Sequence, residues 1–354
     1  MRLLRTSRAG GGLRAPAAPA APVPADASTA RRARDRVSWW RAHRFQVLAL
    51  APSALLLLIF VYGFIAYTLR VSLSKWQGIA PTLDLEHPIG KTYQVLAETP
   101  RFQADMRNVI VFTVLFLALA VIGGLIMAIL VYDTMVARGL FRSIFLFPYA
   151  LSFIVTGVVW RWVFTPSTGA NLILDRLGVD HPPGWITDPR VAGDVSGALE
   201  KVIPGGDFIQ VKLGIPLALI PVVIAASWQL AGFAMANFLA ALGAVPPELR
   251  EAASLDGATW WQYQRRIVLP LLWPMIVAVG VILAHVSLKS FDLVYAMTGQ
   301  GPGFATDVPG IFVFDQTFRA LRWNLGAAAS MVMFVLVAAV ILPYLYRRTL
   351  KEAR

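Results

Sequence analysis

Long apolar stretches separated by polar segments dominate the pattern of this chain. A helix needs about 20 mostly apolar residues to cross a membrane. Six stretches meet that length: about residues 46–69, 108–132, 141–164, 213–243, 268–291 and 325–346. The fourth stretch is longer than one crossing needs, and Pro216 and Pro221 predict irregular first turns in it. The pattern therefore predicts an all-α integral membrane protein with a six-helix core over residues 46–346.

The two ends of the chain are polar. Residues 1–45 precede the first apolar stretch, and their part up to residue 36 is rich in Ala, Pro and Arg without an apolar period. This composition predicts a disordered basic tail, and residues 347–354 predict a second, short tail. The first apolar stretch exceeds the roughly 7–15 apolar residues of a signal peptide and lacks a small-residue cleavage site. It is therefore predicted to be a retained helix.

Charge is sparse and unevenly placed. Apolar residues make up 57% of the chain and charged residues 15%, whereas a soluble domain carries roughly 25% charge. If the N-terminus is inside, 19 of the 32 Lys and Arg fall in inner segments, 11 in outer segments, and Arg70 and Arg161 at outer helix ends. Seven acidic residues fall inside and 13 outside. The positive-inside rule then predicts two cytoplasmic termini and accounts for the net charge of +12 without a nucleic-acid partner.

Residue types that carry catalysis or bind metals do not converge in the sequence. The chain has no cysteine, and its four histidines are scattered, so no metal site is predicted. The nearest match to a phosphate-binding loop is Gly90-Lys91-Thr92, where Leu85 replaces the required first glycine. We therefore expect no catalytic residue, metal or cofactor in this chain, and we expect it not to be an enzyme.

The inner segment over residues 246–267 has a helical pattern of its own. Two prolines end the preceding helix, residues 248–256 predict a short helix, Gly257 permits a sharp turn, and residues 258–267 predict the start of a second helix. On residue types alone, two interpretations stay open. The segment is either an interfacial helix–turn–helix anchored by its aromatic residues or a docking element for a partner.

This segment resembles the cytoplasmic coupling loop of permeases in binding-protein-dependent ABC importers. The shared pattern is Glu-Ala-Ala, three residues, Gly, nine residues, Ile, any residue, and Leu-Pro. All seven specified positions are met within 20 residues: Glu251, Ala252, Ala253, Gly257, Ile267, Leu269 and Pro270. Residues 108–346, about two thirds of the chain, are also similar to carbohydrate permeases of the maltose and glucose/mannose kind, notably at 288–303 and 324–334.

The resemblance implies a permease subunit in a bacterial cell membrane that forms a heterodimer with a second permease. A sugar would pass between them, most simply a mono- or oligosaccharide of the glucose/mannose or maltose/trehalose type. An extracytoplasmic sugar-binding protein would deliver it, and a homodimeric cytoplasmic ATPase would bind ATP and magnesium. The short helix ending at Asp256 would dock on that ATPase, with Glu251 facing basic groups and Ala252 and Ala253 allowing close approach. Closure of the ATPase would then move the membrane helices as rigid bodies.

Polar and aromatic side chains within the apolar stretches mark a candidate sugar pathway. They are Trp228, Gln229 and Phe233 in the fourth stretch, and His285, Ser287, Lys289 and Asp292 in and after the fifth. His285, Lys289 and Asp292 would share one face of a continuous helix. They would line the pathway, or Lys289 and Asp292 would form a pair that only holds helices together. An isolated Trp or Phe at such a depth, as at Trp228 and Phe233, more often packs than contacts a ligand, while the resemblance to the maltose permease places Gln229, Phe233 and Ser287 at sugar-facing positions.

Two other classes of membrane protein compete with this interpretation. A stand-alone secondary carrier predicts buried charged couplers in several helices and a repeat relating the two halves. An integral membrane enzyme predicts a cluster of acid, base or metal ligands. Neither set of features is clear in the sequence.

Overall fold

The computed structural model describes residues 46–134, 138–180, 182–197 and 210–352. The tail predicted over residues 1–45 lies outside these ranges. The chain divides into two units, residues 1–64 and 65–354. The described part of the first unit begins the apolar helix Gln46–Ser72, which contains a π turn, η1 (Leu58–Gly63), and continues as α2 (Phe64–Ser72). No residue in the most apolar 18-residue stretch of this helix is buried, so its surface suits contact with lipid or with a partner protein.

The predicted helical membrane architecture is confirmed. Among the described residues, five helices are long and apolar enough to cross a membrane, or six if one bent pair counts as a crossing. They are Gln46–Ser72, Pro100–Asp133, Leu219–Leu242, Trp260–Leu288, Trp323–Arg347 and the pair Gly139–Ala150 with Phe153–Phe164.

The third apolar stretch, predicted as one helix over 141–164, is broken. Its two halves meet at an angle of 96°. The cause is local: Pro148 cannot donate a helical hydrogen bond, Leu151 is extended (ψ 148°), and the Ser152 side chain accepts from the Val155 N–H at 3.3 Å to begin a new helix. The elements are α5 (Arg138–Leu146), the 3₁₀ turn η2 (Phe147–Ala150) and α6 (Phe153–Phe164).

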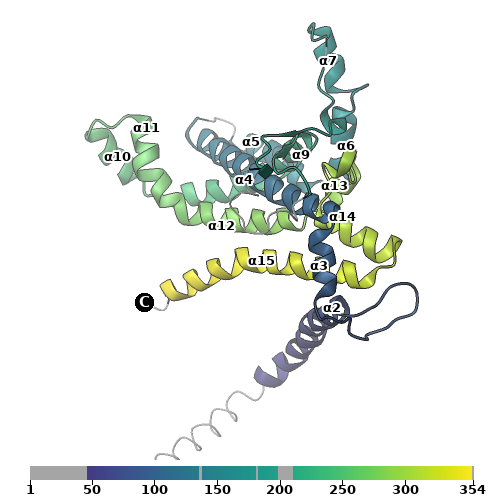
Figure 1. Ribbon diagram of the computed structural model, residues 1–354. Helices are drawn as coiled ribbons and strands as arrows, with labels where there is room; N and C mark the ends of the chain where they lie inside the picture. The colour runs from purple at the N-terminus through teal and green to yellow at the C-terminus, as the bar shows by residue number, and fades with distance from the viewer. Residues whose placement is uncertain (1–45, 135–137, 181, 198–209, 353–354) are drawn as a thin grey trace, which may run out of the picture. The chain divides into compact units, whose positions relative to one another are not determined.

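The remaining elements follow in chain order. They are α3 (Lys91–Glu98), α4 (Pro100–Thr134), α7 (Ala170–Arg176), η3 (Trp185–Thr187), β1 (Val191–Ala192), β2 (Ile215–Pro216), α9 (Leu219–Leu242), α10 (Glu248–Leu255), α11 (Trp260–Tyr263), the π turn η5 (Gln264–Val268), α12 (Leu269–Leu288), α13 (Asp292–Met297), η6 (Pro302–Phe304), α14 (Pro309–Phe314), the π turn η7 (Asp315–Arg319) and α15 (Trp323–Glu352). Figure 1 shows α10 and α11 together beyond one end of α12.

Several predicted boundaries shift. The second helix begins at Pro100 rather than 108, and the fifth spans Trp260–Leu288 rather than 268–291. The fourth helix begins at Leu219 rather than 213, because Ile215 and Pro216 pair in antiparallel register with Ala192 and Val191. The last helix continues through residue 347 to Glu352, into the predicted second tail.

Helix α9 forms the core of the second unit. In its most apolar stretch of 18 residues 72% are buried, against 28% in the corresponding stretch of α4, which packs along α9 (Figure 1). Glycines bring the helix backbones close: a Cβ on Gly124 of α4 would lie 2.6 Å from the Ala234 Cβ of α9. A Cβ on Gly157 of α6 would lie 2.7 Å from the Leu293 carbonyl oxygen of α13. Small residues at such crossings are typical of helices that pack in lipid.

Candidate functional site

The short helix α10 forms where the sequence predicts it. Pro247 lies at its N-cap, and Glu248 and Glu251 lie in the first turn, where negative charge is favourable to the helix dipole. Asp256 is its C-cap residue. The helix therefore begins and ends within one residue of the predicted bounds.

The turn after α10 depends on Gly257. Its φ is +74°, in the left-handed region that glycine adopts without strain. The Ala258 N–H donates to the Ala253 carbonyl at 2.9 Å, and the Gly257 N–H donates to Ser254 at 3.1 Å. These two bonds form a Schellman motif that satisfies the last carbonyls of the helix.

A second helix starts at once. The Thr259 hydroxyl accepts from the Gln262 N–H at 3.3 Å, while the Gln262 side chain accepts from the Thr259 N–H at 2.8 Å, which is a capping box. The helix widens into the π turn η5, whose last bond runs from the Leu269 N–H to the Gln264 carbonyl. Pro270 follows without an N–H, so the wide turn ends where the proline requires it. Ile267 and Leu269 are half-buried.

The two faces of α10 differ. Glu251 and Ala252 are exposed, and Leu255 is 88% exposed, so this face is free for a partner. Ala253 is buried within the chain at 6% exposure, which corrects the expectation that both alanines face an ATPase. The reason is the helical period, because Leu249 and Ala253 lie on one side and Ala252 and Leu255 on the other.

On α9, the predicted pathway residues lie against the break between α5 and α6. Gln229 is 1% exposed, and its Nε2 donates to the Leu151 carbonyl at 2.8 Å, while its Oε1 is buried without a hydrogen-bond partner. Phe233 stacks on Tyr149 at 5.4 Å. Trp228, 41% exposed, meets Trp160 edge to face at 5.6 Å. Gln229 thus supports the broken helix and keeps one acceptor free.

The expected common face of the fifth helix is wrong. Helix α12 ends at Leu288, Lys289 has φ −103° and ψ 12°, and Asp292 opens α13. Asp292 therefore serves as an acidic first-turn residue of the next helix rather than as a neighbour of His285. Both Lys289 and Asp292 are exposed, and the ion pairs of the described residues do not join them. The alternative helix-holding pair is thus not formed either.

Ser287 and His285 remain on α12 near its end. The Ser287 Oγ is buried and lies 2.9 Å from the Thr113 Oγ1 on α4 and 2.9 Å from the Ala284 carbonyl oxygen. The Nδ1 of the half-buried His285 has no hydrogen-bond partner. Ser287 is held by α4 and Gln229 by the α5–α6 break, so the hydrogen bonds do not bring these two predicted sugar ligands together.

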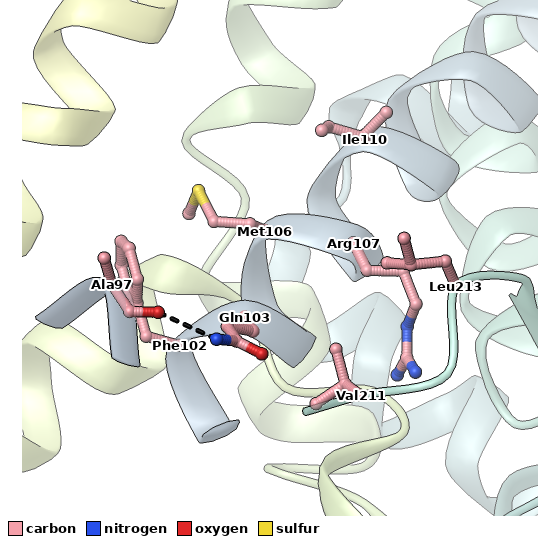
Figure 2. A pocket seen from close by; sticks show the side chains of 8 residues that line it. All are labelled: Ala97, Phe102, Gln103, Met106, Arg107, Ile110, Val211 and Leu213. Carbon is pink, nitrogen blue, oxygen red and sulfur yellow. Dashed lines mark hydrogen bonds between the residues drawn. The ribbon is translucent and has the colours of Figure 1, made fainter. Parts of the chain in front are cut away.

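A cavity of about 330 Å³ lies where α4 meets the segment after residue 209 (Figure 2). Its lining is Ala97, Phe102, Gln103, Met106, Arg107, Ile110, Val211 and Leu213. The two polar side chains are already engaged: Gln103 Nε2 donates to Ala97 and Arg107 Nη1 to the Lys212 carbonyl, each at 2.8 Å. The cavity holds none of the predicted pathway residues and offers few free partners for sugar hydroxyls.

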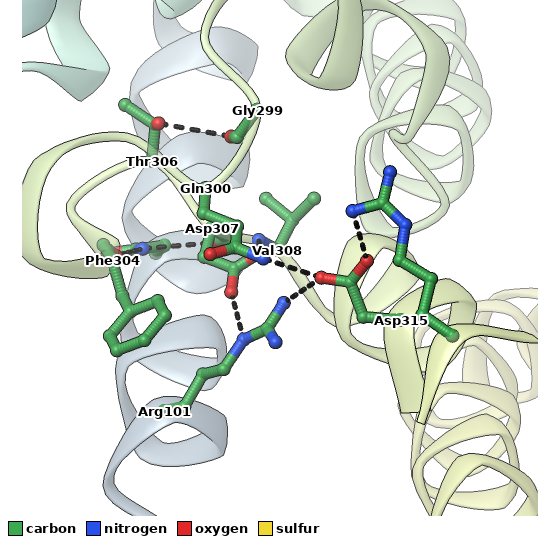
Figure 3. Close-up of polar contacts among 10 residues, drawn as sticks. Arg101, Gly299, Gln300, Phe304, Thr306, Asp307, Val308 and Asp315 are labelled. Atoms are coloured by element: carbon green, nitrogen blue, oxygen red, sulfur yellow. Dashed lines mark hydrogen bonds and ion pairs between the residues drawn. The ribbon is translucent and has the colours of Figure 1, made fainter. Parts of the chain in front are cut away.

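Sequence reasoning missed a buried ionic cluster at the Pro100 end of α4, the Arg101 cluster, which consists of Arg101, Asp105, Asp307 and Asp315. Figure 3 shows Arg101 between Asp307 and Asp315. Arg101 Nε donates to Asp307 at 2.6 Å and Nη2 to Asp315 at 2.7 Å. Asp105 and Asp307 are fully buried, and burial raises the pKa of Asp307 despite the opposing bond from Arg101. Asp307 and Asp315 lie more than 200 residues from Arg101 in sequence, so the spacing of Arg101 and Asp105 on α4 does not by itself reveal the cluster.

Within the described ranges, no three His, Asp or Glu side chains are grouped so as to hold a metal ion. The arrangement instead combines a packed helical core with one exposed helix–turn–helix.

Known proteins share this arrangement. The family described as "Binding-protein-dependent transport system inner membrane component" matches residues 120–351. A probable ABC transporter permease of Pyrococcus horikoshii is 33% identical over 85% of this chain and 94% of its own length. A xylose/arabinose import permease of Haloferax volcanii is 30% identical over 82% and 84%. A bacterial ABC transporter for alginate import superposes with a TM-score of 0.69 at 20% identity, covering 89% of this chain and 99% of its own, which supports the fold.

Proposed function

Because this chain belongs to the family of binding-protein-dependent transport system inner membrane components, we propose that it is a permease subunit of an ATP-driven sugar importer. The permease components of ABC transporters are transport subunits rather than enzymes, and this one is a multi-pass membrane protein. The secondary-carrier and membrane-enzyme interpretations are therefore set aside.

A sugar is the substrate class that the relatives favour, since the Haloferax protein is named for xylose and arabinose. Uncharged sugars need hydrogen-bond partners and ring faces. The exposed rings of Trp228 and Tyr149 supply ring faces on and beside α9, while the unpaired Oε1 of Gln229 is an acceptor buried next to them against the α5–α6 break. We propose a mono- or oligosaccharide of the glucose/mannose or maltose/trehalose type.

The partners follow from the family. Its name states dependence on a binding protein, which would deliver the sugar from outside the cell. A second permease would complete the pathway as a heterodimer, and the apolar surface that α15 exposes supports such a contact. ATP and magnesium would be bound by a homodimeric cytoplasmic ATPase.

Helix α10 is the observation that carries the proposal. It presents Glu251, Ala252 and Leu255 outward from a turn fixed by Gly257, which suits docking into a groove of the ATPase. Such docking would place this loop in the cytoplasm, and the Lys and Arg distribution supports two cytoplasmic termini.

The orientation is testable because the chain has no natural cysteine. Single cysteines introduced at Arg190 and Ala258 should react differently with a membrane-impermeant reagent added to intact cells. We expect labelling at 190 and protection at 258. Equal labelling of both positions from outside would contradict the topology.

Docking is tested in the complete transporter by measuring sugar uptake and the amount of ATPase recovered with the membrane. Ala252→Trp places a large ring on the outward face of α10, and Gly257→Val forces a β-branched residue into a left-handed conformation, at a cost of roughly 1–3 kcal/mol. Both measurements should fall together in both variants.

Ala80→Trp is the matched control, since Ala80 is also exposed but lies in the segment predicted to be outside. It should retain the ATPase. Normal ATPase recovery and uptake in Ala252→Trp would remove α10 as the docking element.

A further inference from the structure

Asp133 joins one end of α4 to the loop between α9 and α12. Its Oδ2 accepts hydrogen bonds from the Trp260 indole nitrogen at 2.8 Å and from the Gln264 Nε2 at 3.0 Å. Its Oδ1 lies 3.5 Å from the Arg250 Nη1. Arg250 belongs to α10, Trp260 to α11 and Gln264 to η5. One carboxylate therefore contacts each helical segment of the loop.

The strength of these contacts differs. The Asp133 side chain is 9% exposed and Gln264 is buried, so the bonds from Gln264 and Trp260 end on a charge that is mostly shielded from water. Hydrogen bonds to a charged acceptor are stronger than those between neutral groups. The Arg250 side chain is 59% exposed and at the limit of ion-pair distance, so it adds little. Trp260 and Gln264 provide most of the attachment.

The packing beside Asp133 is incomplete. A cavity of about 110 Å³ is bounded there by Leu242, Val245, Pro246 and Val268 among others, whereas protein interiors are usually filled to crystal-like density. Leu242 and Val268 also belong to the hydrophobic core, so apolar contacts and the bonds of Asp133 together hold this end of α4 beside the loop. The cavity leaves the loop room to shift.

Helix α4 is suited to carry a displacement. It is continuous over 35 residues, packs along the core helix α9 and bears the Arg101 cluster at its other end. Coupling between distant sites needs a physical element that both can bias. A rigid helix attached at one point to the loop meets that need.

We propose that Asp133 is a positioning residue through which the loop over residues 246–267 moves α4 during transport. The inference rests on the proposed function, because it needs an ATPase that displaces the loop. Asp133 acts here on the loop and α4, without contact with sugar or nucleotide.

The test uses the complete transporter in vesicles and measures sugar uptake, ATP hydrolysis and the amount of ATPase bound. Asp133→Asn removes the negative charge, so the one remaining oxygen accepts from Trp260 and Gln264 as a neutral and weaker acceptor, while the NH₂ group replaces the oxygen beside Arg250. We expect the ATPase to stay bound, while the sugar transported per ATP falls about two- to thirtyfold. A merely structural defect would lower uptake and hydrolysis in proportion.

A paired change separates positioning from damage. Gln264→Glu added to Asp133→Asn lets the new amide donate to the new carboxylate, which restores a charged hydrogen bond between α4 and η5, whereas the Trp260 bond, which ends on the same oxygen in the natural protein, is not restored. This double variant should recover part of the transport per ATP. Asp180→Asn, which changes an exposed acid in a segment predicted to be outside, is the matched control and should behave as wild type.

A wild-type ratio of transport to ATP in Asp133→Asn would overturn the inference and leave the proposed function standing. No recovery in the double variant would overturn it as well. If the unmodified transporter neither bound the ATPase nor took up sugar, the proposed function itself would fall, before any variant was compared.

Discussion

The two ends of α4 are both tied to other segments through charged groups, but the ties are built differently. At the Pro100 end, Arg101 meets two carboxylates at 2.6 and 2.7 Å, and its own side chain is 16% exposed while those of Asp307 and Asp315 are 0% and 8% exposed. About 48 Å away along the helix, Asp133 accepts hydrogen bonds from two neutral donors and forms an ion pair with one exposed arginine at 3.5 Å.

This difference separates a fixed attachment from an adjustable one. A buried arginine with two buried carboxylates cannot be separated without leaving an uncompensated charge, which costs several kcal/mol. Asp133 is about as shielded as Asp315, but its two close donors are neutral, so their displacement leaves no second charge unpaired. The Arg101 cluster therefore suits a part of the molecule that keeps its geometry, and Asp133 suits a joint that moves.

The largest effect is expected from Arg101→Ala. It leaves the fully buried Asp307 without an ion-pair partner and Asp315 with only the exposed Arg319, and it should lower the free energy of unfolding by about 3–5 kcal/mol. Thermal unfolding of the purified protein in detergent would measure it. Arg190→Ala, which breaks the exposed pair with Asp188, is the control and should leave the melting temperature unchanged. Equal melting of both variants would refute the fixed attachment.

A smaller effect is expected from Trp260→Phe, which keeps a ring but removes the N–H that donates to Asp133. Losing this half-exposed hydrogen bond to a charged group should lower the free energy needed to open the loop locally by about 1–2 kcal/mol. Hydrogen exchange of the amides over residues 248–264 should accelerate, while exchange in α14 stays as in wild type. Acceleration in both regions would show that the two ends of α4 are not independent.

Ser287→Ala tests the middle of α4, where the Ser287 hydroxyl meets Thr113. One lost hydrogen bond should cost about 0.5–1.5 kcal/mol, and sugar uptake should fall a few-fold with ATPase recovery unchanged. Thr113→Val removes the same contact from the α4 side. A defect in Ser287→Ala but not in Thr113→Val would favour direct sugar contact by Ser287 over a role in packing.

The smallest effect is expected from Arg250→Ala. An exposed pair at this distance contributes roughly 0–1 kcal/mol and is screened by salt. Loop hydrogen exchange at 0.5 M salt should be the same in this variant and in wild type. A change as large as that of Trp260→Phe would mean that the charge of Arg250, rather than the neutral donors, holds Asp133.

The features that sequence predicts well depend on neighbouring residues. The apolar stretches, the proline-led start of α10 and the left-handed turn at Gly257 all follow from local composition and backbone preference. The break at Leu151 also had a local signal, because Pro148 and a serine able to cap a helix stand four residues apart. The end of α12 had one too, since Asp292 is a typical first-turn residue.

The rest depends on contacts between distant segments. Arg101 and Asp315 meet only because α4, α14 and η7 pack together, and the sequence around either residue does not indicate this contact. Asp133 gave a faint signal: an acid at the C-terminal end of a helix opposes the helix dipole and needs donors from elsewhere. Ala253 was assigned to a docking face because a motif gives spacing but does not say which side of a short helix the protein itself covers.

The π turn over Gln264–Val268 has a mechanical consequence. It contains one residue more than an α turn, and passing that residue along the helix would rotate everything before it by about 100° and advance it by about 1.5 Å. Pro270 blocks such a shift toward α12, since it lacks the N–H that an ordinary turn would use. A displacement of α10 is therefore not absorbed by rewinding the start of α12, and a rotation of the loop is passed on to that helix.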